Sequence, residues 1–567
     1  MAAAVLHRAL DIAAPSPREE EGPIDSVLIY SKTNVGRGIL SNAAKNMGAT
    51  RVRFVSKESD LVAAIENGAY SLVLLDEDAS AYQAHHILDE IRRSGLLDIQ
   101  TIVVIISGEP TYQKVVEAAE NGADVFLARP FSYGALVSRL ETVLTRRNEM
   151  RDVYAALARK DWDGALQLCL ERYQWRQPFW LFAARVAAEI LLAKGQAAQA
   201  QEIYEAIVQQ QALPWARLGI ARAMVERGQV DRAAQQAESL ASPEMVDAYD
   251  ILGRAHLDAG RAEQALQAFA LAVQATRKSH GRLQRLGLMQ MLLGFPRDAA
   301  HSFRDSIRYG IKSQSFEPIV FFWLAHLYRA IGTAADWMWL QERLKEARKY
   351  GHDVALLDDI QLVCDFLRLR RDGASPMGTG VMRRQIEPLL DRARDDDTTF
   401  DQACMVLYAL ADLASRHEDR INDETIVDDI AQRFSVSRLA TEWLCFACRA
   451  YPPYVERVRE RGEHVSRMAR EIAKDLLGSD PQKAAQQMID LVQRTRNPRV
   501  AETVFKLLER HQAKLDNGDA IMAQIQSWVE RLDIEAARRM PGFRYLRHPG
   551  GVALLARAAE KPREPLM

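Results

Sequence analysis

Two cysteines with a metal-binding spacing are the first residues whose types suggest chemistry. Cys445 and Cys448 form a Cys-x-x-Cys pair, a spacing found at zinc sites. They lie within the apolar run Trp443–Cys448, and neither a second cysteine pair nor a histidine cluster stands nearby in the sequence. We therefore interpret both as buried thiols of a helix. The five cysteines are an odd and sparse set for 567 residues, which indicates a reducing compartment.

Other candidate catalytic or binding signals are incomplete. Gly36-Arg37-Gly38 stands where a dinucleotide-binding loop would begin, but Ser41 replaces the third glycine of that fingerprint. His85-His86 and His417-Glu418-Asp419 lack the surroundings of a metal site, and no Ser/His/Asp or Cys/His set, P-loop or basic helix-turn-helix stands out. A formal net charge of -2 and 7% aromatic residues give no case for a nucleic-acid or membrane-surface partner. We predict that the protein is not an enzyme and needs no cofactor or metal.

Residues 26–145 alternate short apolar runs with helical patterns. The third and fourth runs are almost entirely apolar, as expected of strands covered by helices on both faces. Five strand–helix repeats in this length predict an α/β doubly wound, flavodoxin-like domain with five parallel strands. The predicted strands are Ser26–Tyr30, Arg51–Val55, Ser71–Leu75, Thr101–Ile106 and Asp124–Ala128.

Three motifs at the ends of these strands carry a family resemblance. They read Tyr70-Ser71-Leu72-Val73-Leu74-Leu75-Asp76, Ile106-Ser107-Gly108, and Gly122-Ala123-Asp124-Val125-Phe126-Leu127-Ala128-Arg129-Pro130-Phe131. In this order and at these separations they resemble a response-regulator receiver domain of the CheY-like type. The resemblance implies that Asp76 is the phosphoacceptor position, that Ser107 and Phe126 are the switch positions, and that Arg129 replaces the family's lysine.

The residues that stand where the family has an acidic pair, just after the first strand, also differ from the family's pattern. Receivers use that pair to hold Mg²⁺, whereas this chain has Ser31 and Lys32 there. Because Mg²⁺ is bound through carboxylates, the substitution favours a pseudo-receiver in which Lys32 and Arg129 flank Asp76. Two alternatives stay open. One is a phosphorylation-competent regulator switched at Asp76, which would require Mg²⁺ and help from Glu77 or Asp78. The other is a pocket that keeps only a surface ion pair.

A helical repeat follows the first domain. Four glycines recur at spacings of 33, 32 and 34 residues, each followed five residues later by an alanine. Small residues precede the glycines by seven positions, and aromatics follow three of the alanines by four. This pattern resembles the tetratricopeptide (TPR) repeat and predicts an all-α superhelical array. The positions are Gly195, Gly228, Gly260 and Gly294; Ala200, Ala233, Ala265 and Ala299; Ala188, Ala221, Gly253 and Gly287; and Tyr204, Phe269 and Phe303.

Composition and breaks in the pattern suggest five segments. Residues 1–24 contain Pro15, Pro17 and Glu19-Glu20-Glu21 and lack a signal-peptide pattern, so we expect a disordered tail on a cytoplasmic protein. The receiver-like domain then spans 25–148, TPR-like repeats 149–350, a divergent helical-repeat region 351–545 and a C-terminal tail 546–567. A further repeat is expected at Trp323–Gly332 after an insertion within Gly310–Ser315. Ser132–Arg159 should form one helix, or two in line, joining the domain to the array.

These features together predict an atypical response regulator of a bacterial two-component phosphorelay. It would act as a protein-binding adaptor or inhibitor, with the repeat array as its output. The first helices of the repeats would line a concave surface for a protein partner. A histidine kinase or another response regulator would be the partner of the receiver-like domain, and no nucleic acid or membrane is expected.

Overall fold

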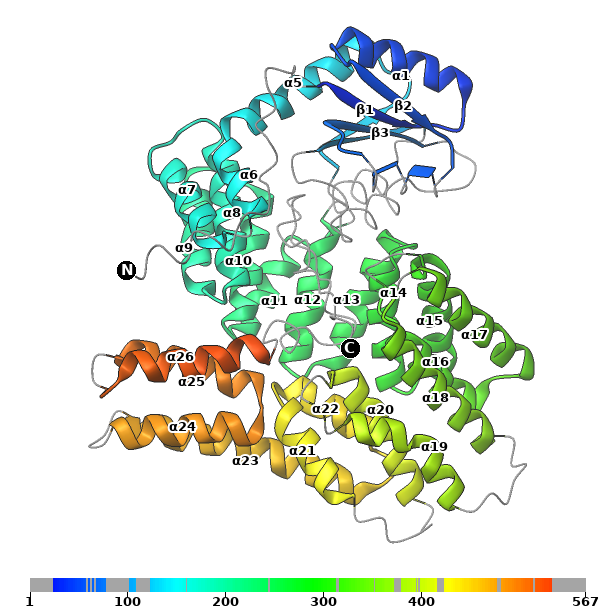
Figure 1. The fold of residues 1–567 in the computed structure, drawn as a ribbon, viewed down its shortest axis with the longest axis vertical. Coiled ribbons are helices and arrows are strands. Elements are labelled where there is room, and N and C mark those ends of the chain that lie inside the picture. The colour runs from blue at the N-terminus through cyan, green and yellow to red at the C-terminus, as the bar shows by residue number, and fades with distance from the viewer. Residues whose placement is uncertain are drawn as a thin grey trace, which may run out of the picture. The chain divides into compact units, whose positions relative to one another are not determined.

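The structure is a computed structural model of the chain (Figure 1). It describes residues 24–57, 60–61, 64–65, 68–77, 101–108, 123–159, 161–242, 245–312, 316–350, 352–371, 379–393, 395, 398–415, 423–476, 481–512 and 515–532. The predicted tails, 1–24 and 546–567, lie outside these residues except for Ile24, which is buried. The described chain divides into two compact units, one ending at Lys194 and the other beginning at Gly195.

The first unit begins with a five-stranded parallel sheet. Its strands are β1 (Ser26–Tyr30), β2 (Arg51–Val55), β3 (Leu72–Glu77), β4 (Ile102–Ser107) and β5 (Val125–Ala128). They lie in the order β2-β1-β3-β4-β5, which is the order of a flavodoxin-like sheet. The predicted fold class is therefore confirmed, and the last three strands each begin one residue later than predicted.

Alternation along the strands divides the core into two layers. Val27 and Ile29 of β1 face one layer, which also contains residues of α1 (Asn34–Asn46) and α5 (Tyr133–Glu149). Leu28 and Tyr30 face the other layer. Burial on both faces explains why β1 and β4 consist almost entirely of apolar residues, and it fixes the register that aligns their ends.

The segment that joins the sheet to the repeats forms two helices in direct succession. The Ser132 side chain accepts a hydrogen bond from the N–H of Ala135 and so caps the start of α5. Met150 leaves the helical region, with φ -105° and ψ 22°, and α6 (Arg151–Ala158) follows at once. Backbone bonds from Met150 N–H to Arg146 O and from Tyr154 N–H to Met150 O, both 3.0 Å, run through the break.

Every described element after β5 is helical, and the predicted TPR-like array is confirmed (Figure 1). The first unit continues with α7 (Trp162–Gln174) and α8 (Trp180–Ala193). The second contains α9 (Ala197–Gln210), α10 (Pro214–Glu226), α11 (Val230–Glu238), α12 (Val246–Asp258), α13 (Ala262–Ala275), α14 (His280–Leu292), α15 (Pro296–Gly310), α16 (Ile319–Ile331), α17 (Ala334–Ala347), α18 (Val354–Arg371), α19 (Thr379–Arg392), α20 (Phe400–Ala414), α21 (Glu424–Phe434), α22 (Arg438–Ala447), α23 (Pro452–Leu476), α24 (Pro481–Thr495), α25 (Pro498–His511) and α26 (Gly518–Arg531).

The periodic glycines form the turns within the helical pairs. Gly260, between α12 and α13, has φ +77°, and Gly228 and Gly294 have φ +73° and +82°. The N–H of Arg261 donates to His256 O at 2.7 Å, and the N–H of Gly260 donates to Leu257 O at 2.9 Å. These two bonds define a Schellman ending, which requires a left-handed residue at the glycine position. The 33-residue spacing therefore reflects one repeated backbone turn.

The small and aromatic positions of the repeat meet inside each pair. A Cβ atom added at Gly253 of α12 would lie 2.5 Å from the Phe269 ring of α13. One added at Gly287 of α14 would lie 2.7 Å from the Phe303 ring of α15. Both rings are almost completely buried. The glycines are therefore needed for close approach of the paired helices, in addition to the turn glycines.

The array changes character at the predicted insertion. α15 ends at Gly310, and α16 begins nine residues later at Ile319. Gly332, which follows α16, has φ -77°, so it does not form the left-handed turn of the earlier repeats. Thr333 and Asp336 instead form a capping box that begins α17. Apolar packing continues from Leu257 to Val458 in one cluster, and a separate cluster joins α23 to α26.

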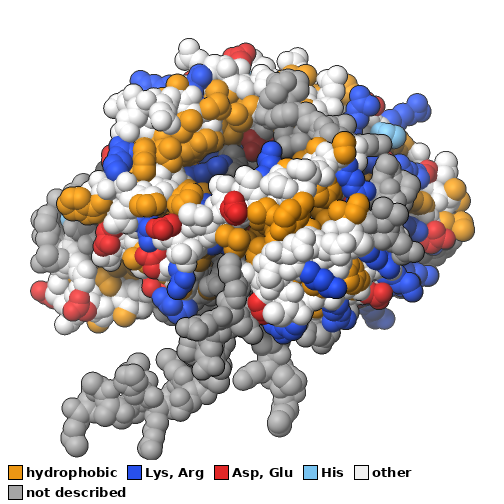
Figure 2. Space-filling model, turned by 90° about the horizontal axis from the view of Figure 1, so that it is seen from above, with side chains coloured by type: hydrophobic (Ala, Val, Ile, Leu, Met, Phe, Trp, Pro, Cys, Tyr) orange, Lys and Arg blue, Asp and Glu red, His pale blue; other side chains and the backbone are white. Residues whose placement is uncertain are grey.

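The surface carries charges of both signs. In the space-filling view, Lys and Arg side chains are interspersed with acidic ones and with patches of hydrophobic side chains on the visible face (Figure 2). This dispersion agrees with a formal net charge of -2. None of the described helices is long and apolar enough to cross a membrane.

Candidate functional site

The carboxyl ends of the parallel strands gather the predicted site residues at one edge of the sheet. Tyr30 of β1 pairs with Leu75 of β3, so the following residues, Ser31 and Asp76, also lie close together. Asp76 is in register with Ile106 of β4, one residue before Ser107. Ligands of open α/β sheets bind at this edge, and the topology therefore supplies the site's location.

Asp76 is held by two neighbours. The Ser31 hydroxyl donates to its Oδ2 atom at 2.8 Å, and the Arg129 guanidinium forms an ion pair and hydrogen bond with Oδ1. The Asp76 side chain is only 3% exposed, and Ser31 is completely buried. Both carboxylate oxygens are thus engaged by the protein itself.

The two partners of Asp76 are themselves held in place. The backbone N–H of Arg129 donates to Ser107 O at 2.9 Å, and that of Ser31 donates to Val55 O at 3.1 Å. The Arg37 side chain donates to Ser31 O at 3.0 Å. A buried carboxylate needs such compensation, because removing it from water without partners is costly.

The remaining predicted positions lie nearby but contact Asp76 less directly. Lys32 is exposed, and among the described residues the cation paired with Asp76 is Arg129. Ser107 is buried at the end of β4, while Phe126 is half-buried and packs against the core on the Leu28 face of the sheet. The structure thus brings Ser31, Asp76 and Arg129 together and leaves Lys32 at the rim.

The described residues at this edge do not fit Mg²⁺. Magnesium is usually held by one or two carboxylates together with water. Asp76 supplies the carboxylate, but its oxygens already accept hydrogen bonds from Ser31 and Arg129. A guanidinium beside the carboxylate also repels a cation. Asp78 and the Glu77 side chain, considered as substitute ligands, lie outside the described residues.

The other predicted signals divide into two groups. Cys445 and Cys448 are buried in and at the end of α22, and burial raises the pKa of Cys445 to about 11 and that of Cys448 to about 12. They are therefore thiols rather than thiolates near neutral pH, in agreement with a packing role. Residues 85–86 and 417–419 lie outside the described part of the chain.

A second polar cluster joins the sheet to the first repeat helices. Asp124, just before β5, accepts hydrogen bonds from Val103 N–H at 3.0 Å, Arg146 at 3.2 Å and Arg147 at 3.0 Å. The Arg146 guanidinium also lies over the Phe182 ring of α8, 4.7 Å from its centroid. We call Asp124, Arg146, Arg147 and Phe182 the junction cluster.

Sequence reasoning did not identify the junction cluster. Its one available signal was the Arg146-Arg147 pair in the last turn of a predicted helix, together with an aspartate at the start of the last strand. Arginines at a helix end are common because they favour the helix dipole, so they do not by themselves indicate a contact 22 residues away. The cluster connects the parallel sheet to α8 within one unit.

Buried charges connect successive first helices of the repeats. Arg282 of α14 donates to Asp250 and Asp247 of α12, both at 2.8 Å. Arg285, one turn later, donates to the other oxygen of Asp250 at 2.9 Å. Asp250, Arg282 and Arg285 are each at most 5% exposed. This network fixes the register of α12 against α14.

The first helix α16 is covered by later helices of the same chain. Trp323 packs against Trp443 of α22 with ring centroids 5.4 Å apart, and Arg329 pairs with Asp412 of α20 at 2.6 Å. All residues from Ile319 to Tyr328 are buried or nearly so. The helices α20 and α22 therefore cover the part of the expected concave surface that α16 would contribute.

His326 lies at the centre of this covered face. Arg449 donates to His326 Nε2 at 3.3 Å, so Nδ1 carries the proton and donates to the Tyr408 hydroxyl at 3.0 Å. Burial, together with the charges of Arg449 and Arg329, lowers the pKa of His326 to about 3. The imidazole is thus neutral throughout the physiological range.

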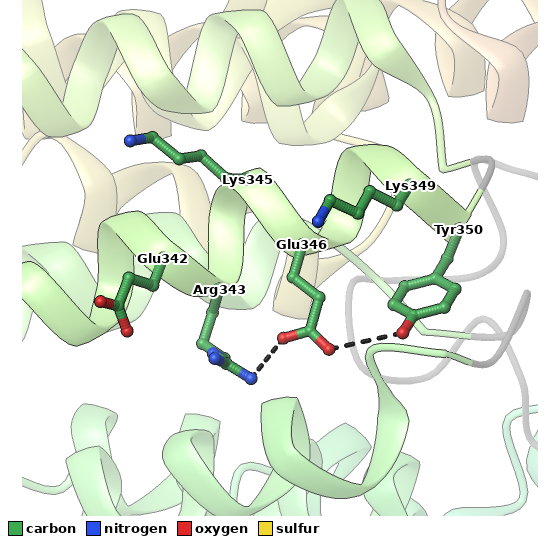
Figure 3. Close-up of a pocket in the computed structure, with 6 residues that line it drawn as sticks. All are labelled: Glu342, Arg343, Lys345, Glu346, Lys349 and Tyr350. Atoms are coloured by element: carbon green, nitrogen blue, oxygen red, sulfur yellow. Dashed lines mark hydrogen bonds and ion pairs between the residues drawn. The ribbon is translucent and has the colours of Figure 1, made fainter.

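A shallow hollow of about 360 Å³ lies on α17 and the short 3-10 helix Arg348–Tyr350 (Figure 3). Its charged side chains carry both signs, from Glu342, Arg343, Lys345, Glu346 and Lys349. Glu346 pairs with Arg343 and accepts a hydrogen bond from the Tyr350 hydroxyl at 3.5 Å. None of the predicted site residues lines this hollow, and its mixed charges select no ligand class.

Comparisons with known proteins give structural likeness only. No family model matches the sequence. Among solved structures, the chain is 14% identical to the C-terminal part of a TPR repeat-containing protein from Cytophaga hutchinsonii, covering 45% of this chain and 98% of that one, with a TM-score of 0.29. It is also 14% identical to a chain of the Naa15/Naa10 structure bound to HypK, covering 68% and 64%, with a TM-score of 0.22. The TPR domain of P58(IPK) is 14% identical over 65% and 99%, with a TM-score of 0.17. At these TM-scores the likeness carries no argument about function.

Proposed function

We propose that the protein is an atypical response regulator whose pseudo-receiver domain controls a protein-binding helical array. The observation that carries the proposal is the engagement of both Asp76 oxygens by Ser31 and Arg129. A phosphoacceptor must present a carboxylate oxygen to the phosphorus atom of its donor. Here that carboxylate is buried and already neutralised by a guanidinium.

In this proposal Arg129 neutralises the negative charge of Asp76 permanently. In a receiver, a metal ion and phosphorylation would change that charge instead. A guanidinium presents several N–H donors in a plane and stays charged at all relevant pH values. It therefore holds Asp76 in one arrangement without an external signal. We propose that the domain is kept in one state and acts as a docking module for a histidine kinase or another response regulator in a bacterial two-component phosphorelay. The same proposal assigns no catalytic activity, no cofactor and a cytoplasmic location.

The output in this proposal is binding of another protein by the array. The first helices α14 and α16 are buried by the chain's own packing. By contrast, α10 and α12 leave Trp215 and Tyr249 partly exposed. Aromatic side chains of this kind are common at the centres of protein interfaces. We place the partner surface on α10 and α12 rather than along the whole row of first helices.

Calorimetric titration with Mg²⁺ tests the proposed state of the site. The wild-type chain should bind Mg²⁺ no better than Asp76→Ala. The double variant Ser31→Asp/Lys32→Asp supplies two carboxylates and removes one donor from Asp76, so its Mg²⁺ affinity should rise above that of both. Saturable binding by the wild type that disappears in Asp76→Ala would favour the phosphorylation-competent alternative and contradict the pseudo-receiver.

A further inference from the structure

Two arginines approach each other on the face that α20 and α22 cover. Arg329 lies in the last turn of α16, and Arg449 follows the end of α22. Arg449 donates to His326 Nε2 at 3.3 Å, and its guanidinium lies 4.2 Å from the centroid of the Phe446 ring. The Arg329 guanidinium lies 5.7 Å from the centroid of the Tyr408 ring. Because His326 also donates to the Tyr408 hydroxyl at 3.0 Å, the imidazole and the phenol connect the two cations.

The charges of the two arginines are balanced differently. Arg329 pairs with Asp412 of α20 at 2.6 Å, through Nη1. Arg449 forms no ion pair with any residue that the structure describes, and its side chain contacts His326 and Phe446 instead. In the described part of the chain, one carboxylate therefore balances two guanidinium groups, and the cluster keeps a surplus positive charge.

The surroundings of Arg449 disfavour its charge and supply no acid in compensation. Burial of the guanidinium lowers the pKa of Arg449, the Tyr408 phenol opposes this effect, and the charge of Arg329 adds to it. None of these groups is a carboxylate. The residue as a whole is nevertheless exposed. A partly desolvated cation that a second cation repels, and that solvent can still reach, is stabilised by an anion from outside the chain.

The helix dipole does not explain this arrangement. Cations are favourable at the end of any helix, and Arg449 directly follows Cys448, the C-cap residue of α22. Arg277 has the same place after Thr276, the C-cap residue of α13. Arg277 is exposed, and its side chain forms no hydrogen bond, ion pair or ring contact with a described residue. The bond to His326 and the nearby second cation thus distinguish Arg449 from an ordinary arginine at a helix end.

We propose that Arg449 and Arg329 form a binding site for an oxyanion, either a phosphate group or the carboxylate of an acidic peptide. A guanidinium presents its N–H groups in a plane that matches two oxygens of such an anion. Arg329 uses one nitrogen for Asp412 and Arg449 uses one for His326, so each keeps N–H groups that no described residue accepts. The neutral imidazole orients Arg449. The site lies outside α10 and α12, and it is independent of the state of Asp76.

Calorimetric titration of the full chain with inorganic phosphate, at constant ionic strength, tests the site. Arg449→Gln should weaken phosphate binding roughly tenfold or more, because the anion loses a charged hydrogen-bond donor. Arg277→Gln is the matched control at a helix end, and its affinity should stay within about twofold of the wild type. Arg449→Lys keeps the charge but loses the planar donors, so its affinity should lie between those of the wild type and Arg449→Gln.

A second series with tetraglutamate identifies the source of the oxyanion. Tighter binding of tetraglutamate than of phosphate, with the same dependence on Arg449, would assign the site to a peptide carboxylate, and the reverse order would assign it to phosphate. Circular dichroism reports whether each variant is folded, and Arg449→Lys decides the outcome if Arg449→Gln is not. The proposal is overturned if the wild type binds neither probe saturably, if Arg449→Gln binds both as well as the wild type, or if Arg277→Gln loses as much affinity as Arg449→Gln.

Discussion

The chemistry available to Asp76 is determined by the side chains around it. A carboxylate at the end of a central strand binds a cation or accepts a phosphoryl group less readily when other groups already hold its oxygens. Ser31 and Arg129 each hold one Asp76 oxygen, and both residues are anchored through backbone bonds to β2 and β4. The same aspartate, at the same place in the sheet, therefore acts as one half of a fixed ion pair.

Removing Arg129 should destabilise the receiver-like domain. Arg129→Ala leaves the buried Asp76 with Ser31 as its partner, at an expected cost of about 1–3 kcal/mol in the free energy of unfolding. Arg139→Ala, at an exposed position of α5, is the matched control and should change little. Urea unfolding monitored by exchange of β3 and β4 peptides measures the difference. An Arg129→Ala variant as stable as wild type would show that the ion pair is not what holds Asp76.

The buried imidazole of His326 predicts a pH-dependent stability of the array. Its folded pKa of about 3 lies below the ordinary value of 6.5. Its contribution is therefore complete above pH 6.5 and is lost as pH falls from 6.5 toward 3, because only the unfolded chain takes up the proton. Between pH 7.5 and 5.5 the wild type should lose about 1.4 kcal/mol more than His326→Gln. Urea unfolding at the two pH values tests this, with the exposed His301→Gln as control; equal losses in all three proteins would contradict it.

The three central site residues were identified from the sequence through the resemblance to receiver domains, whose motifs fall at the ends of apolar runs in this chain. The parallel connection of the strands then predicts that these ends lie at one edge of the sheet. The sequence did not show which charged side chains would contact each other. Lys32 and Arg129 were both expected beside Asp76, yet Lys32 is exposed, because its neighbour Ser31 takes the inward position. The junction cluster was missed, since nothing local to Arg146 indicates that Asp124 is its partner.

Within the helical elements, two kinds of glycine have different roles. The turn glycines are required by a positive φ, whereas Gly253 and Gly287 are required by neighbouring rings. Both kinds of glycine recur at the spacing of the repeat, so the sequence pattern identifies both positions. Gly332 shows the limit of the pattern, because it follows its helix at the expected place but has an ordinary φ, and a Thr333–Asp336 capping box begins the next helix instead. The break between α5 and α6 at Met150 is also not visible in the sequence, because no glycine or proline stands there.

Substitution of Gly253 should separate the packing role from the general effect of glycine in a helix. Gly253→Ala places a methyl group 2.5 Å from the Phe269 ring and should cost roughly 1–3 kcal/mol. Gly281→Ala, in the helix α14, meets no atom within 4 Å and should be neutral or stabilising by about 0.5–1 kcal/mol. Thermal or urea unfolding of the array measures both. Equal effects of the two substitutions would show that close helix approach is not the constraint at Gly253.

At the scale of the first unit, the junction cluster makes the sheet and the first repeat helices one structural body. Asp124 holds the two arginines at the end of α5, and Arg146 reaches α8. Sequence predicted a helical connection, and the side-chain contacts add a second link. The sheet and the first repeat helices of this unit are therefore linked twice, by the helical backbone and by the side chains of the cluster.

Loss of Asp124 should loosen this connection. Asp124→Ala leaves the Val103 N–H and two arginines without their shared acceptor, so local opening between α5 and α6 should increase. We expect tryptic cleavage after Arg147 to accelerate roughly tenfold. Asp152→Ala, which removes a more exposed partner of Arg172, is the control and should have little effect. Unchanged cleavage in Asp124→Ala would mean that the helical backbone alone maintains the connection.

For the whole molecule, the central claim is that the receiver-like domain works without phosphorylation at Asp76. The most direct measurement is the intact mass of the full chain after incubation with acetyl phosphate and Mg²⁺. We expect no phosphoryl adduct on the wild type, and an adduct on Ser31→Asp/Lys32→Asp/Arg129→Lys that disappears when Asp76→Ala is added. Stoichiometric phosphorylation of the wild-type chain, abolished by Asp76→Ala alone, would contradict the account.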